Sequence, residues 1–171
     1  IMDKVCIIPH GVELSLYTKI IGLKPIEKFT FIANKGWRLG ELDRGGIQYL
    51  LKAYLNELTQ KDDVRLLVKL NPAYTYQGWN LDQEFAKLNL KQTDVADIKV
   101  ELRDMTIEEL NNFYNEGDVF VSPTMSEAFN IPCIEAMACF PANTIVNCDS
   151  AIRKRYLRKY SGKFEMSRPF L

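Results

Sequence analysis

Short apolar runs alternate along the chain with longer stretches of helical period. The apolar runs predict six strands, at Val5–Ile8, Phe29–Ala33, Val64–Leu70, Ile98–Leu102, Val119–Ser122 and Thr144–Asn147. The stretches between them predict four helices, at Gly46–Thr59, Leu81–Leu90, Thr106–Asn115 and Pro132–Cys139. Because the apolar runs do not alternate with polar positions, both faces of the sheet should be covered. The pattern therefore predicts a doubly wound α/β domain, with a mainly parallel sheet and helices on both faces.

Two of the predicted helices carry start signals. Thr106-Ile-Glu-Glu109 has the spacing of a capping box, in which the threonine accepts from a first-turn amide and the glutamate bonds back. Pro132 fits the first turn of the last helix, where its missing N–H costs no hydrogen bond, and either Asn130 or Ile131 precedes it as the cap.

Size and composition indicate an ordinary globular domain. The 171 residues are 47% hydrophobic and 26% charged, which excludes a disordered, collagenous or disulfide-scaffold chain. At roughly 150 residues per domain this is one domain. Lysine plus arginine and aspartate plus glutamate each number 22, so nucleic-acid binding driven by net charge is not expected.

A basic C-terminal segment breaks this balance. Residues 151–171 hold seven Lys or Arg residues against one acid, Glu165, and follow the predicted domain at 1–150. A solvated helical segment is the simplest interpretation. An anionic surface bound by the run at 153–168, such as a membrane face or a nucleic acid, is the alternative, and it predicts binding that collapses with salt.

The cysteines and the termini bear on compartment. The four cysteines include no C-x-x-C pair and His10 is the one histidine, so a zinc site is not expected. Free thiols favour a reducing, cytoplasmic location. The chain shows neither a membrane-length apolar run nor a signal peptide. Because a strand-like run already begins at residue 5, we expect a fragment of a longer protein.

Parallel sheets bind ligands at the carboxyl ends of their strands, so the strand-to-helix turns are the candidate sites. No G-x-G-x-x-G, G-x-x-x-x-G-K-[ST] or G-x-S-x-G motif is present, which argues against a dinucleotide-dependent dehydrogenase, a P-loop nucleotidase and a serine hydrolase. The turn at residues 34–46 instead combines four glycines with Lys35, Arg38 and Arg44. Such a turn suits a diphosphate, or is a solvated loop whose charges Glu41 and Asp43 partly compensate.

The turn after Val119–Ser122 carries two acids eight positions apart, Glu127 in the loop and Glu135 on the following helix. Glu135 lies on an otherwise apolar helix, where a carboxylate is costly unless it is hydrogen-bonded. It is therefore either a helix-edge residue paired with a neighbour or part of a site. A glycosidase pair is disfavoured, since such carboxylates usually flank an open cleft from different elements.

Three segments together resemble one enzyme family. They are Cys6-Ile-Ile-Pro9-His10-Gly11-Val12-Glu13, then Asp43-Arg44-Gly45 with Tyr49-Leu-Leu-Lys-Ala-Tyr54, and then Glu116-Gly-Asp118-Val-Phe-Val-Ser-Pro123 through Ser126-Glu127-Ala-Phe-Asn-Ile-Pro132-Cys-Ile-Glu135-Ala-Met-Ala138. From about residue 5 to residue 150 the chain is similar to the donor-binding half of GT-B-fold retaining glycosyltransferases of family 4 (group 1), a Rossmann-like domain. The last segment, with its Glu-x7-Glu spacing, is the specific one.

The resemblance implies a role for each site residue. Glu127 would lie beside the donor sugar as a catalytic residue, with Ala128, Phe129 and Asn130 presenting backbone amides to it, and Glu135 would bind the ribose hydroxyls. Arg44 would hold the diphosphate and stabilise the leaving group, with either Arg38 or Lys35 as its partner. Arg103 and Met105 would border the base. The family's usual metal independence implies that no cofactor and no metal is needed.

Partners follow from the same resemblance. The donor would be a nucleoside-diphosphate sugar, the N-terminal acceptor domain would lie outside this sequence, and peripheral contact at the cytosolic membrane face is possible. We expect the isolated chain to bind donor without catalysing transfer. Ala128-Phe129-Asn130 stands where the family has Gly-Phe-Gly, which predicts a reshaped amide cradle and favours the alternative of a non-catalytic or regulatory sugar-nucleotide module.

Overall fold

The fold is that of a computed structural model, which describes residues 10–22, 28–87, 94–127, 129–139 and 144–146. The predicted strand Val5–Ile8 and the basic segment 151–171 lie outside the described residues.

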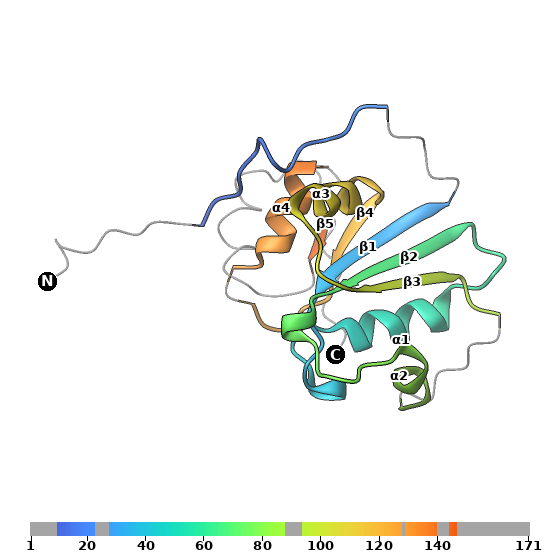
Figure 1. The fold of residues 1–171 in the computed structure, drawn as a ribbon. Coiled ribbons are helices and arrows are strands. Elements are labelled where there is room, and N and C mark those ends of the chain that lie inside the picture. The colour runs from blue at the N-terminus through green and yellow to red at the C-terminus, as the bar shows by residue number, and fades with distance from the viewer. Residues whose placement is uncertain (1–9, 23–27, 88–93, 128, 140–143, 147–171) are drawn as a thin grey trace, which may run out of the picture.

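Five parallel strands form the sheet, in the order β3-β2-β1-β4-β5 (Figure 1). Their bounds are β1 Phe29–Lys35, β2 Val64–Leu70, β3 Asp97–Leu102, β4 Val119–Ser122 and β5 Thr144–Val146. The chain first winds outward from β1 through β2 to β3, and then crosses to the other side of β1 to form β4 and β5. The winding direction therefore reverses between β1 and β4.

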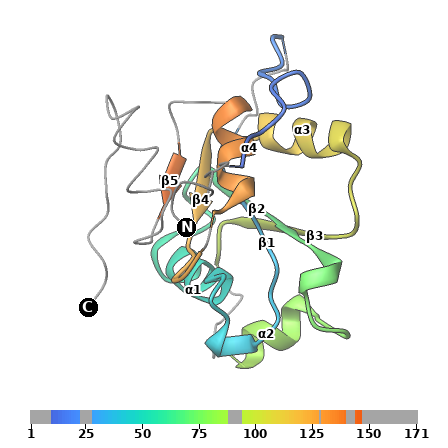
Figure 2. The same cartoon turned by 90° about the vertical axis from the view of Figure 1, so that its left-hand side faces the viewer.

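The helices cover both faces of this sheet. On one face lie α1 (Ile47–Glu57) and α2 (Leu81–Lys87), and on the opposite face lie α3 (Ile107–Asn115) and α4 (Ile131–Cys139), as Figures 1 and 2 show. Short 3-10 helices follow β1 at Gly40–Leu42 and β2 at Pro72–Tyr74. The doubly wound α/β prediction is confirmed. No helix among the described residues is long and apolar enough to cross a membrane.

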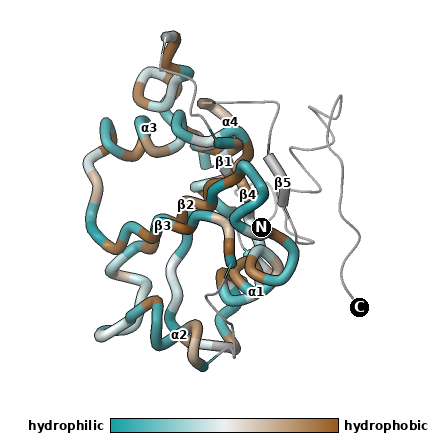
Figure 3. The backbone as a smooth tube through the Cα atoms, turned by 90° about the vertical axis from the view of Figure 1, so that its right-hand side faces the viewer, coloured by the Kyte–Doolittle hydropathy of each residue, from teal (hydrophilic) through white to brown (hydrophobic). Residues whose placement is uncertain are grey.

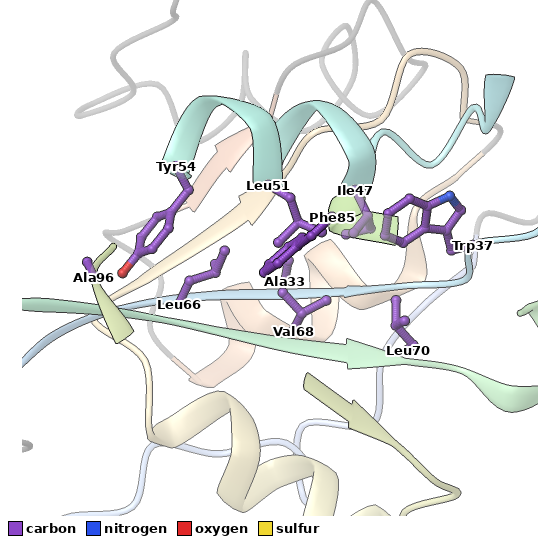
Figure 4. Packing of buried hydrophobic residues seen from close by; sticks show 10 residues of the cluster. All are labelled: Ala33, Trp37, Ile47, Leu51, Tyr54, Leu66, Val68, Leu70, Phe85 and Ala96. Atoms are coloured by element: carbon purple, nitrogen blue, oxygen red, sulfur yellow. The ribbon is translucent and has the colours of Figure 1, made fainter. Parts of the chain in front are cut away.

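Alternate strand residues enter two separate cores. Leu66 and Val68 of β2 pack with Leu51 of α1, whereas Leu67 between them packs with Phe113 of α3. Figure 4 shows the first core, in which α1 side chains meet those of β1 and β2, and in Figure 3 the brown, hydrophobic stretches follow the central strands. Full burial of such a side chain stabilises the fold by about 1.5–3 kcal/mol. This two-sided burial explains the continuous apolar runs.

Most described element boundaries agree with the sequence to within one residue, and the larger differences are the ends of α1, at Glu57 rather than Thr59, and of β1. Thr106 Oγ1 accepts from the Glu109 amide while the Glu109 carboxylate accepts from the Thr106 amide, which confirms the capping box. The first described strand ends at Lys35 rather than Ala33, because pairing with β2 continues through Asn34↔Lys69 and Lys35↔Leu70. Asn34 and Lys35 therefore belong to the strand and not to the turn that follows it.

The segment before β1 packs against α3. The amides of Thr18 and Ile20 donate to the side-chain oxygens of Asn111 and Asn115, at 3.0 and 2.8 Å, and the Asn115 amide group donates back to the Thr18 carbonyl at 2.9 Å. These bonds hold Thr18 and Ile20 against the C-terminal end of α3, where the chain leads into the amino end of β4.

Candidate functional site

The reversal of winding places the candidate site between β1 and β4. These strands are parallel neighbours, and their connections leave toward opposite faces of the sheet. In open α/β sheets this point opens a crevice at the carboxyl ends of the strands. β1 ends at Lys35 and β4 ends at Ser122, so the two turns singled out in the sequence start side by side.

Lys35 joins the two turns through its side chain. Its ammonium lies 3.0 Å from Glu127 Oε2 and 2.6 Å from Asn130 Oδ1. Asn130 Nδ2 in turn donates to Ser122 Oγ at 2.7 Å. The structure thus brings together three of the residues predicted from sequence, and adds Ser122.

Asn130 has a left-handed backbone conformation at the end of this turn, and the reshaped cradle stays a prediction. Its φ is 59°, in the left-handed region that glycine adopts freely and that asparagine tolerates better than most residues. Its carbonyl accepts from the Cys133 amide at 3.0 Å in the first turn of α4, which begins at Ile131. Asparagine therefore reproduces a backbone geometry open to glycine, and adds a buried amide side chain. Ala128 lies outside the described residues.

Asp43 organises the turn after β1. Its buried carboxylate accepts from the amides of Arg38 at 2.6 Å, Leu39 at 3.0 Å and Gly45 at 2.7 Å. Gln48 Nε2 donates to the Asp43 carbonyl at 2.6 Å and so ties the turn to α1. The turn is fixed by these bonds and is not a free loop of self-compensating charges.

Arg44 follows Asp43 and links the two turns through its backbone. Its carbonyl accepts from the Met125 amide at 2.9 Å and from Thr124 Oγ1 at 3.1 Å. At Gly46, where φ is 79°, a Cβ would collide with the Pro123 carbonyl, so only glycine allows this approach. The side chains of Arg44 and Arg38 are exposed to solvent, while Lys35 is buried.

Glu135 belongs to a second chain of hydrogen bonds. Asn34 Nδ2 donates to the Tyr114 hydroxyl at 2.8 Å, and that hydroxyl donates to Glu135 Oε2 at 2.7 Å. The chain joins β1, α3 and α4. The partly buried Glu135 carboxylate is therefore hydrogen-bonded, which removes the cost expected on an apolar helix.

Burial and the Glu135 carboxylate shift the titration of its neighbours. Burial, followed by the negative charge of Glu135, raises the pKa of Tyr114 well above its ordinary value, and the same causes raise the pKa of Tyr17. Burial and then Glu135 also raise the pKa of Cys139 to about 12. Both phenols therefore stay protonated at neutral pH and can act as donors toward the carboxylate.

Three other residues singled out in the sequence have contacts of their own. The His10 ring lies 4.9 Å from the Phe129 ring, centroid to centroid, which places the N-terminal segment on the turn that follows Glu127. Arg103 bonds Glu109 at 2.8 Å, and Met105 packs against the core of the α3 and α4 face. The base-binding role of Arg103 and Met105 stays a prediction.

A metal centre is not formed by the residues that the structure describes, since no three His, Cys, Asp or Glu side chains gather in a group able to hold an ion.

The sequence indicated the charged residues of the candidate site but not the residues that hold them in place. Asn34 and Tyr114 bond each other across 80 residues of the chain, Ser122 bonds Asn130 eight residues away, and no local motif marks any of the three. Asp43 carried a signal, because an Asp two residues before a glycine often accepts from backbone amides in a turn.

Comparison with known proteins gives consistent results. Residues 37–148, more than half of the chain, match the family described as glycosyl transferases group 1. The chain is 28% identical over 144 residues to a D-inositol 3-phosphate glycosyltransferase of Pseudarthrobacter chlorophenolicus. That alignment covers 80% of the chain but 32% of the relative, so the chain spans about a third of the relative's length.

Two solved structures share the fold. One is the C-terminal domain of a glycosyl transferase group 1 family protein from Francisella tularensis, with a TM-score of 0.56 and 19% identity, covering 80% of this chain and 70% of that one. The other is an α,α-trehalose 6-phosphate synthase from Burkholderia multivorans, with a TM-score of 0.51 and 18% identity, covering 70% of this chain and 28% of that one. At these identities the likeness establishes the fold alone.

Proposed function

The chain belongs to the group 1 glycosyl transferases, and we propose that it forms the part of such an enzyme that binds a nucleoside-diphosphate sugar donor. The observation that carries the proposal is the junction of the two turns at the switch point, where Lys35 contacts Glu127 and the Arg44 backbone contacts Thr124 and Met125. Cations, a helix N-terminus and carboxylates then lie at one edge of the sheet.

The diphosphate would bind to Arg44 and Arg38. Both guanidinium groups are exposed on a turn that Asp43 holds in place, and neither has to leave a buried partner to reach a ligand. The N-terminus of α4 adds partial positive charge on the other side of the crevice. Guanidinium groups bind phosphate oxygens in pairs, so Arg44 can serve where the related enzymes usually carry lysine.

The sugar and ribose would bind on the other turn. Glu127 and the backbone of Ala128, Phe129 and Asn130 would face the sugar, and Glu135 would accept from the ribose hydroxyls. A carboxylate has about four acceptor sites, so the bond from Tyr114 leaves room for a vicinal diol. Tyr114 would fix the carboxylate before ribose arrives.

The reaction would be retaining transfer of the sugar to an acceptor in the intact enzyme. As the diphosphate leaves, negative charge grows on its bridging oxygen, and preorganised cations such as Arg44 stabilise that charge. These side chains could meet this need without a metal ion. A further, N-terminal domain would bind the acceptor, and the chain alone would not catalyse transfer. The intact enzyme would be cytoplasmic and would contact the cytosolic face of a membrane.

Thermal unfolding with added nucleotides tests this function. Saturating UDP, GDP or ADP, or the matching nucleotide sugar, should raise the melting temperature, because a ligand of the folded form stabilises it. Arg44→Ala should lower the affinity at least tenfold, since it removes a charge-assisted bond worth roughly 1.5–3 kcal/mol. Glu135→Ala should weaken binding through the ribose, by a smaller factor.

The matched control is Lys52→Ala, which removes an exposed cation from α1, away from both turns. It should leave the nucleotide-induced shift unchanged. The proposed function would be wrong if none of the nucleotides or nucleotide sugars shifted the transition, or if Lys52→Ala weakened binding as much as Arg44→Ala.

A further inference from the structure

Lys35 differs in its surroundings from the other two cations of its turn. Lys35 is the last residue of β1 and its side chain is 7% exposed, whereas Arg38 and Arg44 are exposed. Its charge is already balanced by Glu127, 3.0 Å away. Burial and ion pairing set Lys35 apart from a cation that waits in solvent for a phosphate.

The two acceptors of Lys35 lie three residues apart in one turn. Glu127 Oε2 and Asn130 Oδ1 accept two of the three N–H donors of the ammonium. The Lys35 side chain therefore connects Glu127 with Asn130, the last residue of the turn. The bond from Asn130 to Ser122 fastens the same turn to the end of β4. The turn that carries Glu127 is therefore held to both strands of the switch point.

The third N–H of Lys35 could reach a phosphate only at a side chain that is 7% exposed, with the phosphate charge close to Glu127, and turning the ammonium out toward solvent would break this arrangement. Asn130 is 3% exposed, and its side-chain oxygen would be left as a buried acceptor without its 2.6 Å donor. The Glu127 carboxylate, 27% exposed, would lose its counter-ion. A buried polar group without its partner is costly, while the exposed arginines can reach a phosphate without breaking any such contact.

From these contacts we infer that Lys35 is a positioning residue for Glu127 and the turn at residues 127–130, and not a ligand of the diphosphate. It sets the Glu127 carboxylate and the backbone of this turn for the sugar of the donor. The inference rests on the proposed function, since it assigns roles within the same donor site.

The two roles predict different losses with two probes. A diphosphate ligand contributes equally to a nucleoside diphosphate and to the corresponding nucleotide sugar. A residue that positions the sugar-binding turn contributes to the nucleotide sugar alone. The probes are the pair that binds best among UDP with UDP-glucose, GDP with GDP-mannose, and ADP with ADP-glucose. Calorimetric titration of the full chain with both members of that pair separates the two roles.

Lys35→Met keeps the length of the side chain and removes its charge. It should lower the affinity for the nucleotide sugar at least fivefold and leave that for the nucleoside diphosphate within twofold of the wild type. Arg44→Ala should lower both. Lys28→Met is the matched control, because Lys28 precedes the other end of β1 and pairs with Asp97 at 3.8 Å, and it should change neither affinity.

In Lys35→Met alone the Glu127 carboxylate is left unpaired, which could destabilise the fold. The double variant Lys35→Met with Glu127→Gln controls for this effect, because it removes both charges. It should bind the nucleotide sugar no more weakly than the weaker single variant, as expected for residues that act as a unit. The inference is overturned if Lys35→Met weakens both probes equally, or neither. A wild type that binds no probe overturns the proposed function as well.

Discussion

Asn130 combines a backbone requirement with a side-chain requirement. Its left-handed φ of 59° sets the entry into α4, and its amide group bridges Lys35 and Ser122. Glycine would meet the first requirement alone, and most other residues would meet neither. Asparagine satisfies both, since its short polar side chain reaches local partners and tolerates this conformation.

Two substitutions at this residue separate the requirements. Asn130→Gly should lower the free energy of unfolding by about 1–3 kcal/mol, because Lys35 and Ser122 lose a buried partner. Asn130→Ala loses the same bonds and adds left-handed strain, so it should be less stable than the glycine variant by about 1 kcal/mol. Urea denaturation of the three proteins measures both differences. An alanine variant as stable as the glycine variant would contradict this account of the turn.

At the same scale, sequence motifs indicated the charged residues, and their roles stay predictions. Glu127 and Glu135 were predicted from their spacing, and Arg44 from its place between Asp43 and the glycines. The sequence left open whether Arg38 or Lys35 is the second cation. Their difference in burial carries our inference that Arg38 is that cation, and burial depends on packing across the sheet that a local motif does not encode.

At the scale of elements, hydrophobic pattern and capping predicted most of the fold. The strands Val64–Leu70 and Val119–Ser122 have the predicted bounds, and α3 begins after its predicted cap. The end of β1 was placed too early, because Asn34 and Lys35 are polar and looked like a turn. Both are buried by contacts with α3 and with the turn after β4, which lie about 80 to 95 residues away.

Tyr114 joins three elements, since it lies on α3 and bonds to Asn34 of β1 and Glu135 of α4. Burial and then Glu135 raise its pKa in the folded protein, while tyrosines in an unfolded chain titrate near pH 10. Above about pH 10 the unfolded chain therefore holds fewer protons than the folded one, and stability falls as pH rises. Below that pH the stabilising contribution is fully present.

Tyr114→Phe tests this contribution. At pH 7 the variant should be less stable than the wild type by about 1–3 kcal/mol, because Asn34 and Glu135 lose their common partner. Between pH 8 and pH 10.5 its unfolding free energy should fall by about 1 kcal/mol less than that of the wild type, since one titrating phenol is gone. Denaturant midpoints at both pH values give the comparison.

The other alkaline groups are common to both proteins. The raised pKa of Cys139, like that of Tyr114, makes the free energy of unfolding fall as pH rises. The pKa of Lys69, which burial lowers, makes it rise with pH. Their effects cancel in the difference between variant and wild type. Equal losses in the two proteins would show that Tyr114 does not titrate as its burial requires.

At the scale of the whole molecule, strand order determines where the site forms. The crossing from β3 to β4 brings the ends of β1 and β4 together, although Lys35 and Ser122 lie far apart in the sequence. The alternation of strands and helices predicted a doubly wound sheet with ligands at its carboxyl edge. The strand order itself came only from the structure, because pairing partners are not encoded in local pattern.

The central claim is that the two turns at the switch point bind the diphosphate of a sugar-nucleotide donor. The most direct test is a crystal structure of the full chain with the nucleoside diphosphate that it binds best. The account predicts phosphate oxygens within hydrogen-bond distance of the Arg44 guanidinium and in front of the α4 N-terminus, with Lys35 still bonded to Glu127. A diphosphate bound at any other edge of the sheet, or with Arg44 turned away from it, would contradict the account.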